Sequence, residues 1–133
     1  MAEVCWLSER DAQLARARRL SVTDAGGALA LIDAVLAQAP DDVDTLRAKA
    51  DVLAEAGDER QARGCLDRIL ALDPADPRAL IDRADLEPDV ARARALYDRA
   101  IVALQARGAG EGAGGDLHAA RRGRAATLKT EAS

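Results

Sequence analysis

Apolar and small residues recur along this chain at an offset of 34 positions. Across that offset, small residues align with small ones and large apolar residues with large ones. Pro40 and Pro74 share the same spacing, and a pair of residues that includes aspartate follows each proline. Because one offset covers a helical pattern, a turn and a proline stop, the sequence predicts duplicated pairs of helices. The aligned pairs are Ala28 with Ala62, Ile32 with Leu66, Val35 with Ile69, Leu36 with Leu70, Leu46 with Leu80, and Ala50 with Ala84.

Residues typical of helix ends mark the boundaries of the predicted helices. Asp24, Asp58 and Asp76 are suited to N-caps, and Pro77 to a first helical position. Gly57 is suited to a C-cap, where a left-handed backbone is needed. We expect helices that open at Ser8, follow Asp24, run from about Asp44 to Ala56, from Asp58 to before Pro74, from Asp76 to about Leu86, and from about Asp89 to Gln105.

The best-defined unit combines large and small residues at fixed helical spacings. Its first helix carries Leu46, Ala50 and Leu53, and its second carries Ala62 and Leu66 before the closing proline. This pattern resembles the tetratricopeptide repeat, over roughly residues 9–107 and about three degenerate units. The resemblance implies an all-α fold, a short solenoid of antiparallel helix pairs. Small residues at the crossing of two helices permit close approach, which suits Ala50 and Ala62.

The chain is expected to divide into a helical repeat domain over residues 1–107 and a tail over residues 108–133. The tail opens with a glycine-rich linker over 108–115, and Asp116 could then cap a last helix. A helix that covers the end of the repeats, a disordered tail and a partner-binding tail are all compatible with this sequence. The apolar stripe of the expected helix, which spans 117–130, consists of Leu117, Ala120, Ala125 and Leu128.

Composition agrees with a helical fold and gives little support to nucleic-acid binding. The chain has one Trp, one Tyr and no Phe, and its formal net charge is −4. Residues 21–107 carry a net charge of −6, whereas residues 1–20 and 108–133 each carry +1. An acidic body without aromatic stacking platforms is a poor nucleic-acid surface, so that function is only a minor alternative. It would use the arginine-rich ends, Arg16, Arg18, Arg19, Arg121, Arg122 and Arg124.

The sequence also predicts where the protein resides. No segment approaches the about 20 apolar residues of a membrane span, and none resembles a signal peptide. Cys5 and Cys65 are far apart and form no metal-binding motif, and Cys65 is expected to act as a small buried apolar residue. We therefore expect a soluble, cytoplasmic protein. Seventeen Arg against two Lys, with abundant Ala and Gly, favour a GC-rich bacterial genome.

Catalytic chemistry finds no support in the sequence. The only histidine is His118, and the two cysteines are not paired with it. No nucleophile–histidine–acid set, zinc ligand set or phosphate-binding glycine loop can be assembled from such residues. The prediction is therefore a protein that is not an enzyme and that needs no cofactor and no metal.

The resemblance implies that the first helix of each unit lines a concave face that holds the ligand. Like charges close together on this face predict a peptide or protein partner of basic or mixed charge. The same charges could also serve as ion pairs within their helices, as Arg47 with Asp51 and Arg78 with Asp82. The helix that opens at Ser8 would add Arg10, Gln13 and Ala17. The candidate binding residues are Asp44, Arg47, Asp51, Glu55, Arg78, Ile81, Asp82 and Asp85.

Two functions follow as hypotheses. The first is a non-catalytic protein-interaction module, an adaptor or scaffold that binds a peptide or protein segment on an acidic concave face. The alternative is a homo-oligomeric structural or assembly protein whose repeats stack end to end. Trp6, expected just before the first helix, either fixes the entry of that helix or serves as an exposed anchor for the partner.

Overall fold

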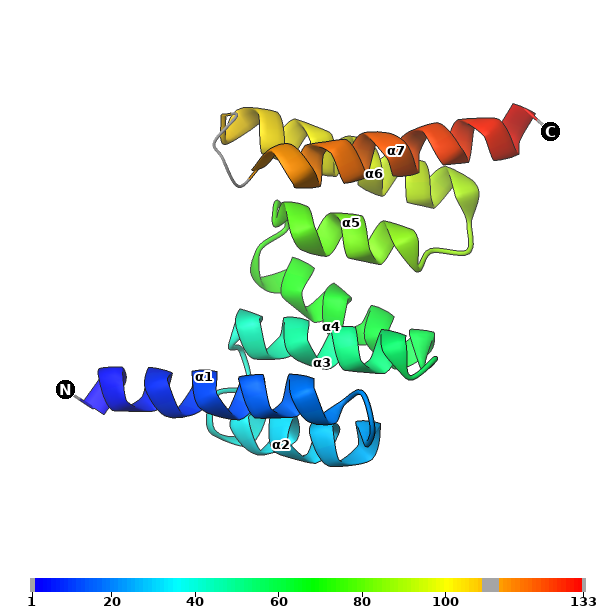
Figure 1. Cartoon of the computed structure of the whole chain (residues 1–133). Coiled ribbons are helices and arrows are strands. Elements are labelled where there is room, and N and C mark those ends of the chain that lie inside the picture. The colour runs from blue at the N-terminus through cyan, green and yellow to red at the C-terminus, as the bar shows by residue number, and fades with distance from the viewer. Residues whose placement is uncertain (1, 109–112, 133) are drawn as a thin grey trace. The chain divides into compact units, whose positions relative to one another are not determined.

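The computed structural model describes residues 2–108 and 113–132, with the side chains of residues 8–108 and 115–129. Over these residues all of the regular structure is helical (Figure 1). The expectation of an all-α chain is therefore confirmed. The seven described helices are α1 (Ala2–Leu20), α2 (Ala25–Gln38), α3 (Val43–Glu55), α4 (Glu59–Leu72), α5 (Pro77–Asp85), α6 (Val90–Ala106) and α7 (Ala113–Ala132).

The chain forms two compact units, Met1–Cys65 and Leu66–Ser133, with the boundary inside α4. In the first unit, α1 packs along α2, and α3 lies against both. Ala17 and Ala28 are fully buried where α1 and α2 meet, which lets the two helices approach closely. The core of this unit consists of Leu14, Ala17, Ala28, Ile32, Ala48 and Val52.

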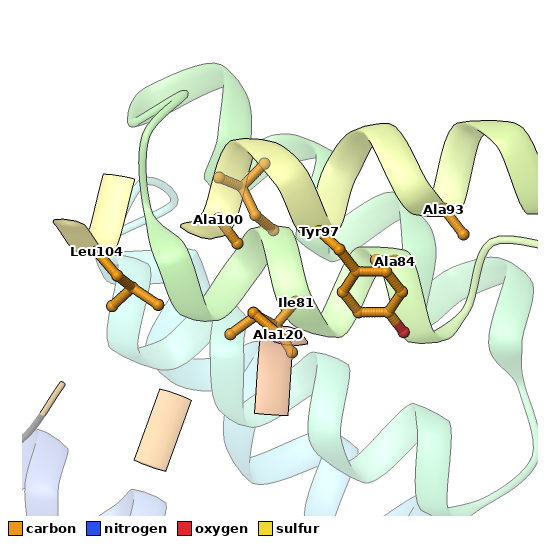
Figure 2. Close-up of a cluster of buried hydrophobic side chains, with 8 residues drawn as sticks. Ile81, Ala84, Ala93, Tyr97, Ala100, Leu104 and Ala120 are labelled. Atoms are coloured by element: carbon orange, nitrogen blue, oxygen red, sulfur yellow. The ribbon is translucent and has the colours of Figure 1, made fainter. Parts of the chain in front are cut away.

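The second unit repeats this arrangement with other helices. Here α5 packs along α6, and α7 lies against both, as α3 does against α1 and α2. The C-terminal half of α4 adds Leu70 at the edge of the core. This core mixes alanines with larger side chains (Figure 2), so side chains of neighbouring helices can interdigitate. The core of the second unit consists of Leu80, Ile81, Ala84, Ala93, Tyr97, Ala100, Leu104 and Ala120.

Residues that are 34 positions apart in the sequence are also buried to a similar extent. Five of the six aligned pairs are buried at both positions, and the sixth, Leu36 with Leu70, is half-buried at both. Small residues that align, such as Ala28 and Ala62, are both at 0% exposure. Ala50 and Ala62, predicted at a helix crossing, are both buried.

Helix ends follow the predicted capping chemistry. The Asp24 carboxylate accepts a hydrogen bond from the backbone N–H of Gly27 at 2.9 Å, and the Asp76 carboxylate accepts one from Ala79 at 3.2 Å. Gly57 has a φ of +87°, as a C-cap glycine requires. These contacts fix where α2 and α5 begin and where α3 ends.

Two helix boundaries differ from the sequence prediction. Helix α1 begins at Ala2, so Ser8 is not its N-cap but an exposed residue inside the helix, and Trp6 also lies within α1. No Gly or Pro interrupts residues 2–7, so the helix continues through them. The Trp6 side chain lies outside the described residues, and its role as an anchor stays a prediction.

Helix α7 also begins earlier than expected. It starts at Ala113 and therefore includes Gly115, which was predicted to belong to the linker, whereas residues 109–112 of that linker lie outside the described part of the chain. Of the expected apolar stripe, Ala120 is buried, but Ala125 and Leu128 are exposed. The stripe prediction was thus wrong for its second half.

Instead, α7 docks through a glycine. A Cβ atom placed on Gly123 would lie 2.3 Å from the ring of Tyr97, so only glycine allows α7 this close to α6. Arg124 forms an ion pair with Asp98 at 2.5 Å next to that contact. The last helix is therefore held by shape and charge more than by a broad apolar face.

Tyr97 provides a probe of this second core. Burial raises the pKa of Tyr97 well above its ordinary value, and the hydrogen bond that its hydroxyl donates to Asp85 raises it further. The folded protein thus holds the phenol proton more tightly than the unfolded chain does. Below about pH 10, the usual tyrosine pKa, the free energy of unfolding does not change with the titration of Tyr97, and as pH rises beyond it the free energy of unfolding falls.

We therefore expect the Asp85→Asn variant to titrate Tyr97 at a lower pH than the wild type. Asparagine removes the negative charge that disfavours the phenolate. Because the chain has one tyrosine, phenolate absorbance measures this pKa without interference. Equal midpoints in the two proteins would contradict the contact between Tyr97 and Asp85.

Candidate functional site

A groove runs between α1 and α3 in the first unit. Its volume is about 340 Å³, and both charged and apolar side chains line it. The two helices that form its walls are the first helices of successive pairs, since α2 connects them along the chain. We call this surface the α1–α3 groove. Its lining consists of Arg10, Asp11, Leu14, Ala15, Arg18, Asp44 and Arg47.

A network of ion pairs around Arg10 fixes one end of this groove. Arg10 lies 2.8 Å from Asp11, 3.0 Å from Asp42 and 3.4 Å from Asp44. The hydrogen bond with Asp11 raises the pKa of Arg10, and the charges of Asp42 and Asp44 add to this effect, which outweighs burial. Asp42 occupies the N-cap of α3, yet its carboxylate bonds to Arg10 and Thr45. The start of α3 is thereby tied to α1.

The predicted binding residues of α3 divide into two groups. Asp44 and Arg47 line the α1–α3 groove. Asp51 and Glu55 are exposed on α3 but do not contribute to the groove lining. The structure therefore brings two of the four together in one hollow and leaves the other two on the same helix beyond it.

Only one of the three α1 residues that the sequence suggested lies in the groove. Arg10 lines it, but Gln13 donates a hydrogen bond to the backbone carbonyl of Leu31 in α2 at 3.1 Å, and Ala17 is fully buried in the core. The sequence prediction was wrong about the rotation of α1. The spacing i, i+4, i+7 marks the correct face. That face carries Asp11, Ala15 and Arg18.

Ile81 was wrongly predicted to contact a partner. Its side chain is 5% exposed and belongs to the core cluster that includes Ala120 of α7 (Figure 2). The reason is that α7 packs against α5 as well as α6, so α5 buries a wider face than one helix pair alone would require.

The other predicted residues of α5 make contacts within their own unit. Asp82 forms an ion pair with Arg78 at 3.2 Å, and Arg78 also lies 3.6 Å from Asp116 of α7. Asp85 accepts the hydrogen bond from Tyr97. In this unit the carboxylates of α5 therefore make contacts within α5 and with α6, and Arg78 links α5 to α7.

In the part of the chain that the structure describes, the other reactive side chains do not come together in one site. Among the described residues, no cluster of three or more His, Cys, Asp and Glu side chains is suited to hold a metal ion. Cys65 is half-buried, and burial raises the pKa of its thiol, which keeps it protonated at neutral pH. His118 is exposed on α7. None of the helices in the described ranges has the length and apolar character needed to cross a bilayer.

Comparisons with known proteins give one consistent result. The sequence model of a family described as tetratricopeptide repeat matches residues 19–86. Among solved structures, the crystal structure of the Sgt2 TPR domain from Aspergillus fumigatus aligns with a TM-score of 0.74 and 19% sequence identity, over 92% of this chain and 78% of that chain. At this identity the likeness concerns the fold alone, and it confirms the expected helical-repeat class. A comparison with curated proteins gives no match.

Proposed function

Because the chain belongs to the tetratricopeptide repeat family, whose domains bind proteins or peptides, we propose that it is a non-catalytic adaptor or scaffold that holds a partner segment in the α1–α3 groove. The observation that carries this proposal is the groove itself. It has a volume of about 340 Å³ and lies between the first helices of two successive pairs. The helices on either side are fixed by the Arg10 network, so the hollow is formed before a partner arrives.

The partner segment is of mixed charge. The groove lining combines three arginines with two aspartates around Leu14 and Ala15. Beyond the groove, α3 presents the exposed carboxylates of Asp51 and Glu55. A segment with an acidic side chain near Arg18 and a basic one toward Asp51 and Glu55 matches this distribution, and apolar side chains would cover Leu14. Of the two partner types expected from the sequence, basic or mixed in charge, this lining favours the mixed one.

Affinity capture with a charge-reversed variant tests this assignment. We expect Asp51→Lys with Glu55→Lys to weaken the binding of a captured partner by roughly tenfold, the effect of reversing two exposed charges. Glu9→Lys is the control for reversing a carboxylate elsewhere, since Glu9 is exposed on the side of α1 toward α2, next to Gln13 and Leu31. Both variants should keep the helicity of the wild type in circular dichroism. Equal partner affinity in wild type and the double variant would contradict the placement of a basic partner side chain beside Asp51 and Glu55.

Self-association through the repeat ends is the alternative function. In the second unit, α7 packs over α5 and α6 where a further helix pair would otherwise stack. A second copy that bound there would first have to displace α7, so we expect a monomer. Light scattering across a concentration series should give the mass of 14.0 kDa throughout. A larger discrete species would favour the assembly hypothesis.

A further inference from the structure

A second groove lies in the second unit, between α4 and α6. Its volume is about 500 Å³, larger than that of the α1–α3 groove. Leu70 and Ala71 of α4, with Ala95 and Leu96 of α6, supply the apolar part of its lining. Leu70 and Leu96 are half-buried and rest on the core, whereas the two alanines are exposed. The floor of this α4–α6 groove is therefore apolar and rigidly supported.

The charged side chains around this floor differ in how well they are neutralised. Arg83, at the end of α5, lies 2.8 Å from Asp67 and 2.9 Å from Glu87, so the two carboxylates more than neutralise its charge. The α6 wall carries two more guanidinium groups, Arg92 and Arg99. They are seven residues apart, two turns or about 10 Å along one side of the helix.

These two arginines have weak or neutral contacts within the unit. The Arg92 side chain is 78% exposed, and its ion pair with Asp89 spans 3.9 Å. Arg99 donates a hydrogen bond to the backbone carbonyl of Pro74 at 3.0 Å, which orients its guanidinium without neutralising the charge. An apolar floor with a cationic wall results, within residues 21–107, whose net charge is −6.

We propose that the α4–α6 groove is a second docking surface, which binds an acidic amphipathic segment of a protein partner. Apolar side chains of that segment lie over Leu70 and Leu96, and its carboxylates pair with Arg92 and Arg99. Charge complementarity selects an acidic occupant, since a basic segment would place its cations against the arginine wall. The groove lacks aromatic side chains that could stack on bases, so a nucleic acid fits it poorly. This site is independent of the α1–α3 groove.

The test uses the full chain, labelled with ¹⁵N, and a short amphipathic peptide made of Leu and Glu. A second peptide with Gln at every Glu position controls for apolar binding alone. We expect amide shifts confined to the helix segments around Leu70 and Leu96, with the Glu peptide bound more tightly than the Gln peptide. Equal affinities, or shifts located elsewhere, would exclude an acidic partner at this groove.

Charge variants make the same test by another route. Arg92→Glu with Arg99→Glu should weaken binding of the Glu peptide by about two- to thirty-fold, the effect of losing two exposed ion pairs. Ala95→Glu, at an exposed and helix-compatible position, should weaken it likewise without removing any contact. The control is Arg121→Glu with Arg122→Glu, which changes the net charge equally on the exposed surface of α7.

Two results with these variants would also overturn the proposal of an acidic partner in the α4–α6 groove. One is an equal loss of affinity in the α7 control, which would mean that net charge alone attracts the peptide. The other is a concentration-dependent dimer that Ala95→Glu abolishes, which would make a second copy of this chain the occupant. None of these variants changes a residue that lines the α1–α3 groove, so the two proposals can fail separately.

Discussion

Replacing Leu80 by Ala should lower the free energy of unfolding by about 2–5 kcal/mol. Leu80 is 1% exposed in α5 and contributes to the core beneath α6 and α7, so its removal leaves a cavity that neighbouring helices cannot fill. For a domain that is stable by about 5–15 kcal/mol, this is a large loss. Urea denaturation followed by circular dichroism measures it, and the near-ultraviolet signal of Tyr97 reports on the same core.

Leu72 provides the matched control. It is 44% exposed at the end of α4 and therefore loses little on truncation. We expect Leu72→Ala to change the free energy of unfolding by less than about 1 kcal/mol. Similar losses for the two variants would mean that the buried cluster around Leu80 is not the core of this unit.

Replacing Gly123 by Ala should destabilise the second unit by about 1–3 kcal/mol, although alanine is the better helix former. The added Cβ would lie 2.3 Å from Cζ and 2.4 Å from Cε1 of Tyr97. Because the ring is buried and its hydroxyl is bonded to Asp85, the ring cannot simply turn away. The expected result is a loosened α7, measured by faster hydrogen exchange over that helix.

Gly115→Ala, in the same helix, is expected to stabilise the protein instead. No heavy atom of the described residues lies within 4 Å of a Cβ placed there, so only the gain in helix propensity remains. That gain is worth up to about 1 kcal/mol. If both glycine variants stabilised the protein, the close packing of α7 on Tyr97 would be wrong.

The repeat and its core were predictable from the sequence because burial leaves a periodic record. The pairs offset by 34 residues align small with small and large with large, and the same positions are buried or half-buried. Caps were predictable because their chemistry is local. Asp24 and Asp76 each bond a backbone N–H three residues on, which requires no knowledge of the rest of the fold.

The errors arose where one helix contacts more than one neighbour. Ile81 was predicted to be exposed from the pattern of α5 alone, but α7 buries it. Ala17 was assigned to the concave face, whereas it lies in the close contact of α1 with α2. The packing role of Gly123 was not predicted, because a glycine inside a helix lowers helix stability and its benefit depends on a neighbour that the sequence does not identify. The one sequence feature that indicates this close packing is the spacing of three between the small residues Ala120 and Gly123.

The candidate surface was predictable only in part. The family resemblance predicts a binding face on the first helices of the pairs. Of the residues predicted on α3, Asp44 and Arg47 line the α1–α3 groove. Arg18 was missed because the rotation of α1 depends on how it packs against both α2 and α3. Side-chain patterns of one helix cannot determine that rotation.

The most direct test of the proposed function compares two arginines on one helix. Arg16 and Arg18 are both exposed on α1, but only Arg18 lines the α1–α3 groove, whereas Arg16 lies toward α2 near Leu31. The measurement is the Kd of a captured partner segment for Arg18→Glu and for Arg16→Glu. We expect about tenfold weaker binding for Arg18→Glu and a Kd close to wild type for Arg16→Glu. Equal Kd values for the two variants would contradict binding in this groove.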